Sequence, residues 1–323
     1  MASQHVAQQH GHVLAEPRAA TSLRGQRWSR ASLRLAPWLL ITPWLIGLFA
    51  ITLGPMLASL ILSFTDYNLL RQTNWVGLTN YIRMFTDDRK FFAAVGVTVN
   101  YVLVSVPLQL AFALAIAVVL NRGLAGLAFY RSMYYLPSLL GSSVAIVLLW
   151  RQIFGSAGLV NQVLSAIGFT NLPAWIASPD YALDTLILLH VWTFGSPMII
   201  FLAGLRQIPQ DLYEAAAVDG AGTWTKFWRI TIPMLSPVIF FNLVLQMIHA
   251  FQSFTQSYVV SGGNGGPVDS TLMYTLYMYQ QAFTNFRMGY ASAMAWLLVI
   301  VIGLLTALAF WTSKHWVHYA GEK

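Results

Sequence analysis

The charged side chains between residues 206 and 229 form a compact group in the middle of an otherwise apolar sequence. They are three acids and three bases: Arg206, Asp211, Glu214, Asp219, Lys226 and Arg229. Each would cost about 2.5–3.5 kcal/mol at the centre of a bilayer, so the segment must lie in water although apolar runs flank it. The chemistry that it offers is polar contact with a partner, because no nucleophile or metal-ligand constellation accompanies it.

A stripe of neutral polar residues marks a second candidate site. Gln246, His249, Ser253 and Gln256 fall at i, i+3, i+7 and i+10 of an apolar segment, which places them on one helical face. In a membrane such side chains turn toward a protein interior or a water-filled cavity. Two interpretations stay open: the stripe lines a path for a polyhydroxylated, uncharged solute, or it holds neighbouring helices together by hydrogen bonds. Weaker candidates for the path are Asn100, Gln109, Trp192 and Ser196.

Several classes of function are disfavoured by what the sequence lacks. It has no cysteine, no His-x-x-x-His or His-Glu pair and no Ser in a nucleophile elbow, so an integral-membrane enzyme is disfavoured and no metal or cofactor is expected on this chain. It has no GxxxxGK phosphate loop, so it cannot bind ATP by that device. Only His190 and His249 are titratable in the central parts of the apolar segments, which argues against an ion-driven transporter. A chain that moves solute uphill must therefore take its energy from a partner.

The elements that position these residues are membrane helices. The sequence is 57% hydrophobic and 9% charged, far from the roughly 25% charge of a soluble domain. Six apolar segments are long enough to span a bilayer, which needs about 20 residues each. We number them as the first to sixth spans: 36–64, 92–119, 132–154, 182–204, 234–258 and 288–313. The sequence thus predicts an all-α polytopic membrane protein with six transmembrane helices, and residues 155–181 as an external loop with a short interfacial helix.

The distribution of Lys and Arg predicts the orientation. With the N-terminus inside, the inner side holds twelve of the 18 bases and the outer side six, so both termini are expected in the cytoplasm. The net charge of +7 then marks cytoplasmic surfaces and lipid contact rather than nucleic acid. We interpret residues 1–34 as a disordered cytoplasmic tail and 316–323 as a C-terminal tail. A mixed-charge external loop follows the first span, and it either meets a soluble protein or is merely solvated: Asp66, Arg83, Asp87, Asp88, Arg89 and Lys90.

The segment between the fourth and fifth spans has the pattern of a helical hairpin. The run DLYEAAAV at 211–218 favours a helix with acids near its start. Gly220 permits a tight turn. A second amphipathic segment carries Trp224, Phe227 and Trp228, and Pro233 is expected to end it. Exposed aromatic residues with polar neighbours indicate a docking surface, although a hairpin lying on the membrane surface explains the pattern equally well.

The hairpin resembles the EAA loop of permease subunits in bacterial ATP-binding-cassette importers. The matching pattern is Glu214-Ala215-Ala216, Gly220, Ile230 and Pro233, with Ile232 where that family usually has Leu. Flanking stretches resemble its carbohydrate branch, the maltose and glycerol-phosphate type. They are NWVGLTNYIRMF (74–85), FYRSMYYLPSLL (129–140), LRQIPQDLYEAAAVDGAG (205–222) and SGGNGGPVDST (261–271). The resemblance covers about 36–313.

The resemblance implies a type I importer permease fold over 35–315, with 206–233 as a cytoplasmic coupling loop that fits a cleft of the ATPase. Glu214 would be its polar anchor, Gly220 its turn and Asp219 a hydrogen-bonding cap. The implied partners are a homologous, non-identical second permease, two ATPase subunits that hold ATP and Mg, and an extracytoplasmic sugar-binding protein. The implied location is the bacterial inner membrane. The alternative within this class is a non-sugar solute such as glycerol phosphate or an amino acid.

Overall fold

Helices dominate the computed structural model, which describes residues 30–123 and 126–318. Within those ranges the extended pairing is limited to an isolated antiparallel bridge between Thr65 and Trp75. The predicted all-α class is confirmed. The chain forms two compact units, Met1–Pro55 and Met56–Lys323.

The first unit holds the start of the first span. Helix α1 (Arg30–Gly47) continues through a π-helical turn, η1 (Leu48–Leu53), into α2 (Gly54–Leu62). The apolar stretch Pro37–Leu62 is long enough to cross a membrane, as predicted for 36–64. Because α1 begins at Arg30, residues 30–34 are helical rather than part of the predicted disordered tail. The rest of that tail lies outside the described residues.

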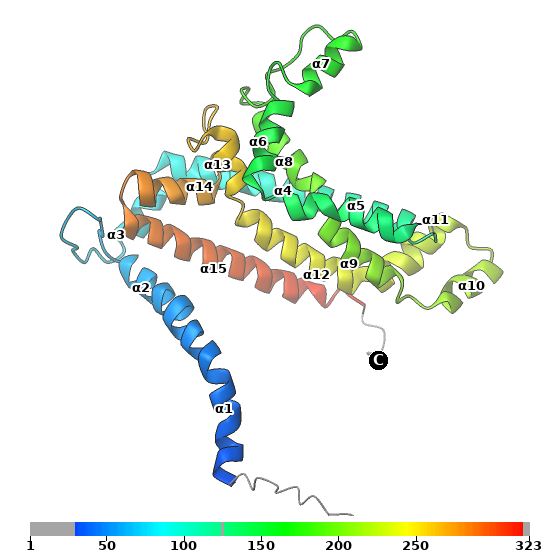
Figure 1. The fold of residues 1–323 in the computed structure, drawn as a ribbon, viewed down its shortest axis with the longest axis horizontal. Helices are drawn as coiled ribbons and strands as arrows, with labels where there is room; N and C mark the ends of the chain where they lie inside the picture. Colours follow the sequence, from blue (N-terminus) through cyan, green and yellow to red (C-terminus); the bar gives the residue numbers. More distant parts are fainter. Residues whose placement is uncertain (1–29, 124–125, 319–323) are drawn as a thin grey trace, which may run out of the picture. The chain divides into compact units, whose positions relative to one another are not determined.

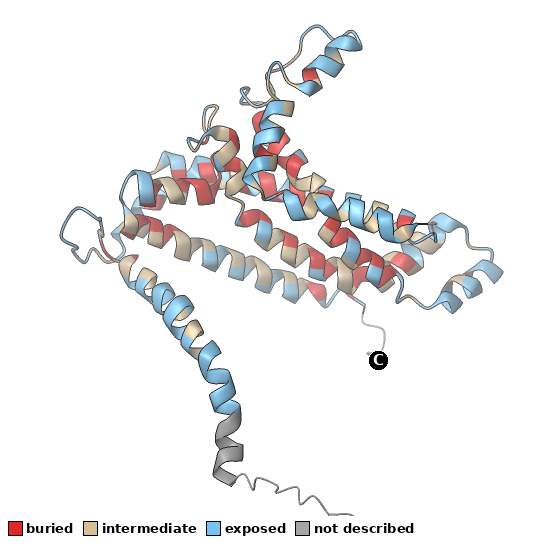
Figure 2. Cartoon of the chain, in the orientation of Figure 1, coloured by how far each residue is buried: buried red, intermediate tan, exposed pale blue. Residues whose placement is uncertain are grey.

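The second unit is built around α4 (Arg89–Leu120), which packs against α8 (Ala182–Trp192), α9 (Gly195–Leu205) and α12 (Ile232–Phe251) (Figure 1). Its buried residues recur every three or four positions and include small ones that let neighbouring helices approach: Ala94, Thr98, Ser105, Ala113 and Ala117. The opposite face is apolar and exposed, as the pale blue bands in Figure 2 show, and Leu103 is 67% exposed. Such a face suits lipid contact.

The six predicted spans correspond to four single spans and two bent pairs. The four spans that are not bent pairs are Pro37–Leu62, Arg89–Leu120, Thr223–Ser261 and Met288–Ser313. Of these, Thr223–Ser261 is interrupted between Phe251 and Thr255, and the last is α15. The third span consists of α5 (Leu127–Leu140) and α6 (Val144–Ile153), bent by 95°. The fourth consists of α8 and α9, bent by 41°. The chain has six spans if each bent pair crosses the membrane once.

The bend in the third span was not predicted, and it lies at Gly141. A Cβ atom there would lie 2.1 Å from Cγ2 of Thr193, and one at Gly195 would lie 2.3 Å from the carbonyl oxygen of Tyr134. Glycine at both positions therefore lets the breaks in the third and fourth spans touch. Gly141 and the two serines after it are poor helix formers, which makes the helix easiest to interrupt here.

Pro233 does not end a separate helix, contrary to the prediction. Helix α11 (Thr223–Lys226) runs through a second π-helical turn, η2 (Phe227–Thr231), directly into α12. The backbone N–H of Ile232 donates to the carbonyl of Phe227, five residues back. This wider turn relieves the clash that a proline ring makes with a preceding carbonyl. The second arm of the hairpin is thus continuous with the fifth span.

The predicted external loop 155–181 contains a short helix, α7 (Leu159–Ala166). Asn161 fixes it, because its Nδ2 donates to the carbonyls of Ser156 (2.9 Å) and Pro173 (3.1 Å) while its Oδ1 accepts from the Trp175 indole (2.7 Å). The remaining short elements are α3 (Thr79–Thr86), α13 (Thr255–Ser261), α14 (Tyr274–Tyr279) and the π-helical turn η3 (Gln280–Thr284).

Replacing Gly195 with Ala is expected to destabilise the protein by about 1–3 kcal/mol, because its new methyl group overlaps backbone that cannot move aside. Thermal unfolding in detergent measures the loss. Gly303→Ala in α15 is the matched control, since a Cβ there meets nothing within 4 Å. Equal melting temperatures for the two variants would contradict close contact between the broken spans.

Candidate functional site

A polar cavity of about 510 Å³ lies where three interrupted spans meet. The third span breaks after Leu140, the fourth at Thr193 and Phe194, and the fifth between Phe251 and Thr255. The predicted stripe of Gln246, His249, Ser253 and Gln256 lines the cavity in full. The structure therefore brings the stripe to a cavity, as one of its two interpretations requires.

The break in the fourth span frees backbone carbonyls that need donors. Nε2 of Gln109 donates to the carbonyls of His190 (3.0 Å) and Thr193 (3.1 Å), and the Ser138 hydroxyl donates to the same Thr193 carbonyl (2.7 Å). Oγ of Ser138 also accepts from the backbone N–H of Ser196 (2.9 Å). Side chains of α4 and α5 thus satisfy the broken backbone, which would otherwise be costly in a membrane.

The break in the fifth span is held by residues of α14 and of the segment after the break. The carbonyl of Ser253 accepts a hydrogen bond from the hydroxyl of Thr275 in α14. The hydroxyl of Ser253 donates to Oε1 of Gln256 (3.1 Å). The ring of Phe254 packs on Tyr258 and Tyr279, with centroids 5.3 and 5.1 Å away. The segment at the break is therefore fixed to α14.

The cavity lining is polar but carries no Asp, Glu, Lys or Arg. It offers amides, hydroxyls and the imidazoles of His190 and His249. His190 packs edge-on against Tyr101 at 5.5 Å. In the described part of the chain, no three His, Asp or Glu side chains are grouped so that they could hold a metal. This lining can donate and accept hydrogen bonds to an uncharged, hydroxyl-rich molecule.

The four weaker candidates divide into two pairs. Gln109 and Ser196 line the cavity. Asn100 is exposed elsewhere on α4, and Trp192 packs against Trp150, with centroids 6.0 Å apart, so neither is a lining residue. Sequence reasoning missed further lining residues: Ser138, Gly141, Ser142, Thr193, Gln252 and Thr255. A Gly-Ser-Ser run inside an apolar segment was the available signal for the first of the three breaks.

The hairpin between the fourth and fifth spans consists of α10 (Gln210–Val218), a turn, and α11. The turn is a Schellman motif, in which the N–H of Ala221 donates to the carbonyl of Ala216 (2.9 Å) and that of Gly220 to the carbonyl of Ala217 (3.0 Å). Gly220 has φ +77°, and a Cβ there would meet nothing within 4 Å. Glycine is needed for backbone conformation and not for space.

The residues expected to contact a partner lie on the surface of this hairpin. Glu214, Ala215 and Asp219 are exposed, and no residue of α10 is buried. The carboxylate of Asp219 accepts no hydrogen bond among the described residues, so the backbone closes the helix and the expected side-chain cap is not seen. Tyr213 was missed by the sequence reasoning, and its hydroxyl shares a hydrogen bond of 2.9 Å with that of Thr231. This bond ties the two arms together.

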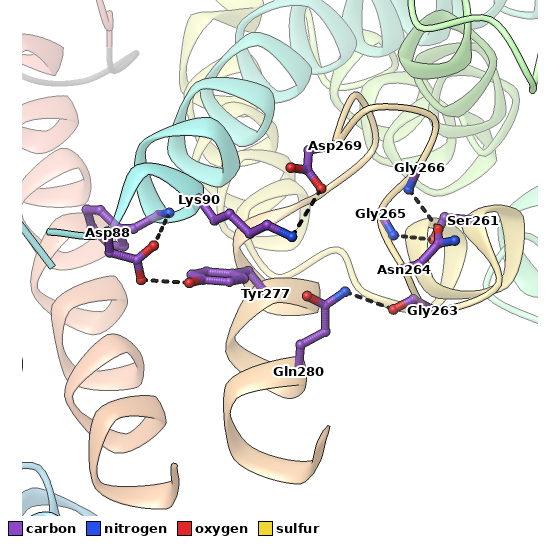
Figure 3. Close-up of polar contacts among 11 residues, drawn as sticks. Asp88, Lys90, Ser261, Gly263, Asn264, Gly265, Gly266, Asp269, Tyr277 and Gln280 are labelled. Atoms are coloured by element: carbon purple, nitrogen blue, oxygen red, sulfur yellow. Dashed lines mark hydrogen bonds and ion pairs between the residues drawn. The ribbon is translucent and has the colours of Figure 1, made fainter. Parts of the chain in front are cut away.

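A carboxylate joins three elements of the second unit, as Figure 3 shows in part. Asp88 caps α4 by accepting from the N–H of Phe91 (3.0 Å), and it accepts from the hydroxyls of Tyr277 in α14 and Tyr290 in α15, both at 2.6 Å. Burial alone would raise the pKa of Asp88, but the hydrogen bonds from the two tyrosines and from Phe91 lower the pKa below its usual value. Asp88 is thus a structural residue rather than a solvated one.

The Gly-rich segment 261–271 lies beside this carboxylate in Figure 3, where Lys90 reaches Asp269 at 3.9 Å. Side chains hold its backbone: Gly265 N–H donates to the Ser261 hydroxyl (3.1 Å), and the Gly263 carbonyl accepts from Nε2 of Gln280 (2.8 Å). A Cβ at Gly265 would lie 2.6 Å from Leu272. Side-chain hydrogen bonds and close packing therefore hold the segment in a defined conformation.

The sequence of this chain matches a known protein family and is similar to named relatives. The family described as the binding-protein-dependent transport system inner membrane component matches residues 86–315. A probable ABC transporter permease protein, YesP of Bacillus subtilis, is 51% identical over 90% of this chain and 94% of its own length. The lactose transport system permease protein LacF of Rhizobium radiobacter is 34% identical over 88% of this chain and 98% of its own.

Solved structures have the same fold. A chain from a bacterial alginate ABC transporter in complex with an alginate pentasaccharide-bound periplasmic protein aligns with a TM-score of 0.75. The two chains are 22% identical in sequence. The alignment covers 88% of this chain and 98% of the alginate transporter chain. The predicted type I importer permease fold is confirmed.

Asp88→Ala is expected to lower the free energy of unfolding by about 1–3 kcal/mol, because two buried tyrosine hydroxyls lose their acceptor. Since the native pKa of Asp88 is lowered, its contribution is complete above its ordinary pKa of about 3.9 and is lost as the pH falls through the native value. The stability difference between wild type and Asp88→Asn should therefore shrink on acidification. Unfolding in detergent across this pH range measures it, with Asp87→Ala as control. A difference that does not depend on pH would contradict this role.

Proposed function

This chain belongs to the binding-protein-dependent transport system inner membrane components, and we propose that it is the permease subunit through which an ATP-driven importer passes a sugar. It is a transport component and not an enzyme. The observation that carries the proposal is the polar, uncharged cavity at the three helix breaks. Discontinuous membrane helices commonly form solute sites near the middle of the bilayer.

A neutral sugar suits the cavity better than a charged solute. Amides and hydroxyls such as those of Gln246, Ser253 and Gln256 pair with sugar hydroxyls, whereas an amino acid or glycerol phosphate would need a cation that this lining lacks. Relatives whose names specify lactose, arabinooligosaccharides and trehalose or maltose support this class. A second, homologous permease would supply the other wall of the path.

We assign coupling to the hairpin of α10 and α11, which would contact a separate ATPase in the cytoplasm. Glu214, Ala215 and Ala216 would form the contact together with Asp219 and Gly220, and ATP and Mg would bind to the ATPase. An uninterrupted helical path through α11, η2 and α12 leads from Thr223 past Pro233 to Phe251, at the cavity. Movement of the hairpin can therefore reach the break at Ser253 through one stiff element.

The proposed assembly has one copy of this chain, one homologous permease, two ATPase subunits and an extracytoplasmic sugar-binding protein in a bacterial inner membrane. Both termini would lie in the cytoplasm, as the excess of Lys and Arg on that side predicts. The ordered Gly-rich segment 261–271 at the opposite end gives the binding protein a firm surface to meet.

Gly220→Val is expected to uncouple transport from ATP hydrolysis. A β-branched residue strongly disfavours φ +77°, so the turn must change and displace α10. In reconstituted complex, sugar uptake per ATP hydrolysed should fall at least several-fold while the subunit stays inserted. Gly222→Val controls for bulk, because Gly222 has φ −69° and equal free space. Unchanged uptake in the Gly220 variant would contradict the assignment of the hairpin.

Gln256→Leu is expected to raise the solute concentration that half-saturates uptake by about tenfold, because one hydrogen bond to the solute is lost. The assay is uptake by the complete complex from a panel of lactose, maltose, trehalose, glutamate and glycerol 3-phosphate. Gln162→Leu, on α7 and away from the cavity, is the control. Uptake confined to glutamate or glycerol 3-phosphate would overturn the sugar proposal, and an unaffected Gln256 variant would remove this residue from the path.

A further inference from the structure

Two adjoining cavities open where α4 ends beside the hairpin, and neither belongs to the solute path. The first, of about 220 Å³, has apolar walls at Val118, Leu205 and Phe227 and these polar lining residues: Asn121, Arg122, Tyr213, Thr223, Lys226 and Thr231. The second, of about 290 Å³, is lined by Ala115, Val118, Trp224 and Phe227. Val118, Arg122, Thr223 and Phe227 line both, so the two form one continuous hollow with a polar and an apolar compartment.

The polar compartment carries two positive charges and no negative one. Arg122 and Lys226 line it, and no Asp or Glu does. Among the described residues, neither Arg122 nor Lys226 lies within ion-pair distance of a carboxylate. The salt bridge found in those ranges joins Lys90 to Asp269, outside this cavity. Hydroxyls of Tyr213, Thr223 and Thr231 add hydrogen-bonding groups to the two cations. Arginine, lysine and hydroxyl groups together are the lining that a phosphate group requires.

The apolar compartment adjoins these charges. Ala115, Val118 and Arg122 occur at i, i+3 and i+7 of the second span and its end, so one face of that helix passes from apolar to cationic. Trp224 stacks on Phe227 with centroids 5.9 Å apart and is 72% exposed. Tryptophan beside a basic residue at a helix end is typical of the membrane interface. A free phosphate ion has no apolar part that could fill this compartment, whereas a lipid does.

We propose that this hollow binds an anionic phospholipid, with its phosphate between Arg122 and Lys226 and its glycerol and upper acyl chain against Val118, Trp224 and Phe227. Basic pockets between membrane helices on the cytoplasmic side hold lipid headgroups in this way. The inference rests on the membrane location of the family and not on the identity of the solute.

The bound lipid joins parts that must move together. Tyr213 belongs to α10, Lys226 to α11 and Arg122 follows α4, so a single headgroup contacts both arms of the hairpin and the end of the second span. It reinforces the contact that Tyr213 and Thr231 already make at 2.9 Å. Anionic lipid therefore stiffens the connection between hairpin and bundle and raises the coupling of solute transport to ATP hydrolysis.

The test compares the complete complex in nanodiscs of phosphatidylcholine, with and without phosphatidylglycerol. Native mass spectrometry counts the retained phosphatidylglycerol, and solute-stimulated ATP hydrolysis reports coupling. Replacing both Arg122 and Lys226 with Gln should remove one retained phosphatidylglycerol per copy of this chain and abolish its effect on coupling. Each single replacement should weaken retention about fivefold. Trp224→Ala should also weaken retention, which a purely ionic site would not show.

The control is Lys314→Gln, which removes an exposed base just after α15, outside both cavities. It should leave retention and coupling unchanged. Unaltered phosphatidylglycerol retention in the double variant would overturn the proposal. So would restoration of coupling by inorganic phosphate in phosphatidylcholine alone, which would indicate a free-anion site. Loss of the ATPase subunit with lipid still retained would show that the two bases contact that subunit instead.

Discussion

Every backbone N–H and C=O group inside a bilayer needs a partner, and this requirement governs the centre of the molecule. A continuous helix meets it without help, but a broken one does not. The break at Thr193 is tolerated because Gln109 and Ser138 supply donors to its carbonyls. The break at Ser253 is held by Thr275. The fourth and fifth spans are thus interrupted where polar side chains from neighbouring helices reach the gap.

The same requirement places the polar cavity. Side chains that repair the breaks bring amides and hydroxyls to one cavity, and the interrupted helices leave space between them. Gly141 and Gly195 allow the third and fourth spans to approach closely beside it. A cavity built this way is polar without being charged, so it can hold hydroxyl-rich solutes while the surrounding helices remain apolar enough for the membrane. The fifth span then links the cavity to the hairpin through one helical path.

The sequence predicted what depends on local pattern and missed what depends on distant pairing. The spans, the hairpin and the turn at Gly220 follow from apolar run length, helix propensity and backbone freedom, which neighbouring residues determine. The role of Asp88 does not follow from local pattern, because its partners Tyr277 and Tyr290 lie 189 and 202 residues away in the sequence. The contact between Gln109 and Thr193 spans 84 residues. Pro233 was misjudged because a local rule for proline does not anticipate the π-helical turn before it.

The most direct test of the account is the water accessibility of the break in the fifth span. The chain has no native cysteine, so Ser253→Cys introduces a single thiol on this subunit, and Leu304→Cys introduces one on the apolar face of α15 as a reference. In the complete complex, a membrane-impermeant maleimide should modify Ser253→Cys, the transported sugar should slow that reaction, and Leu304→Cys should stay unmodified. A thiol at position 253 that is inert, or that reacts at one rate whether or not sugar is present, would contradict a solute path through the three helix breaks.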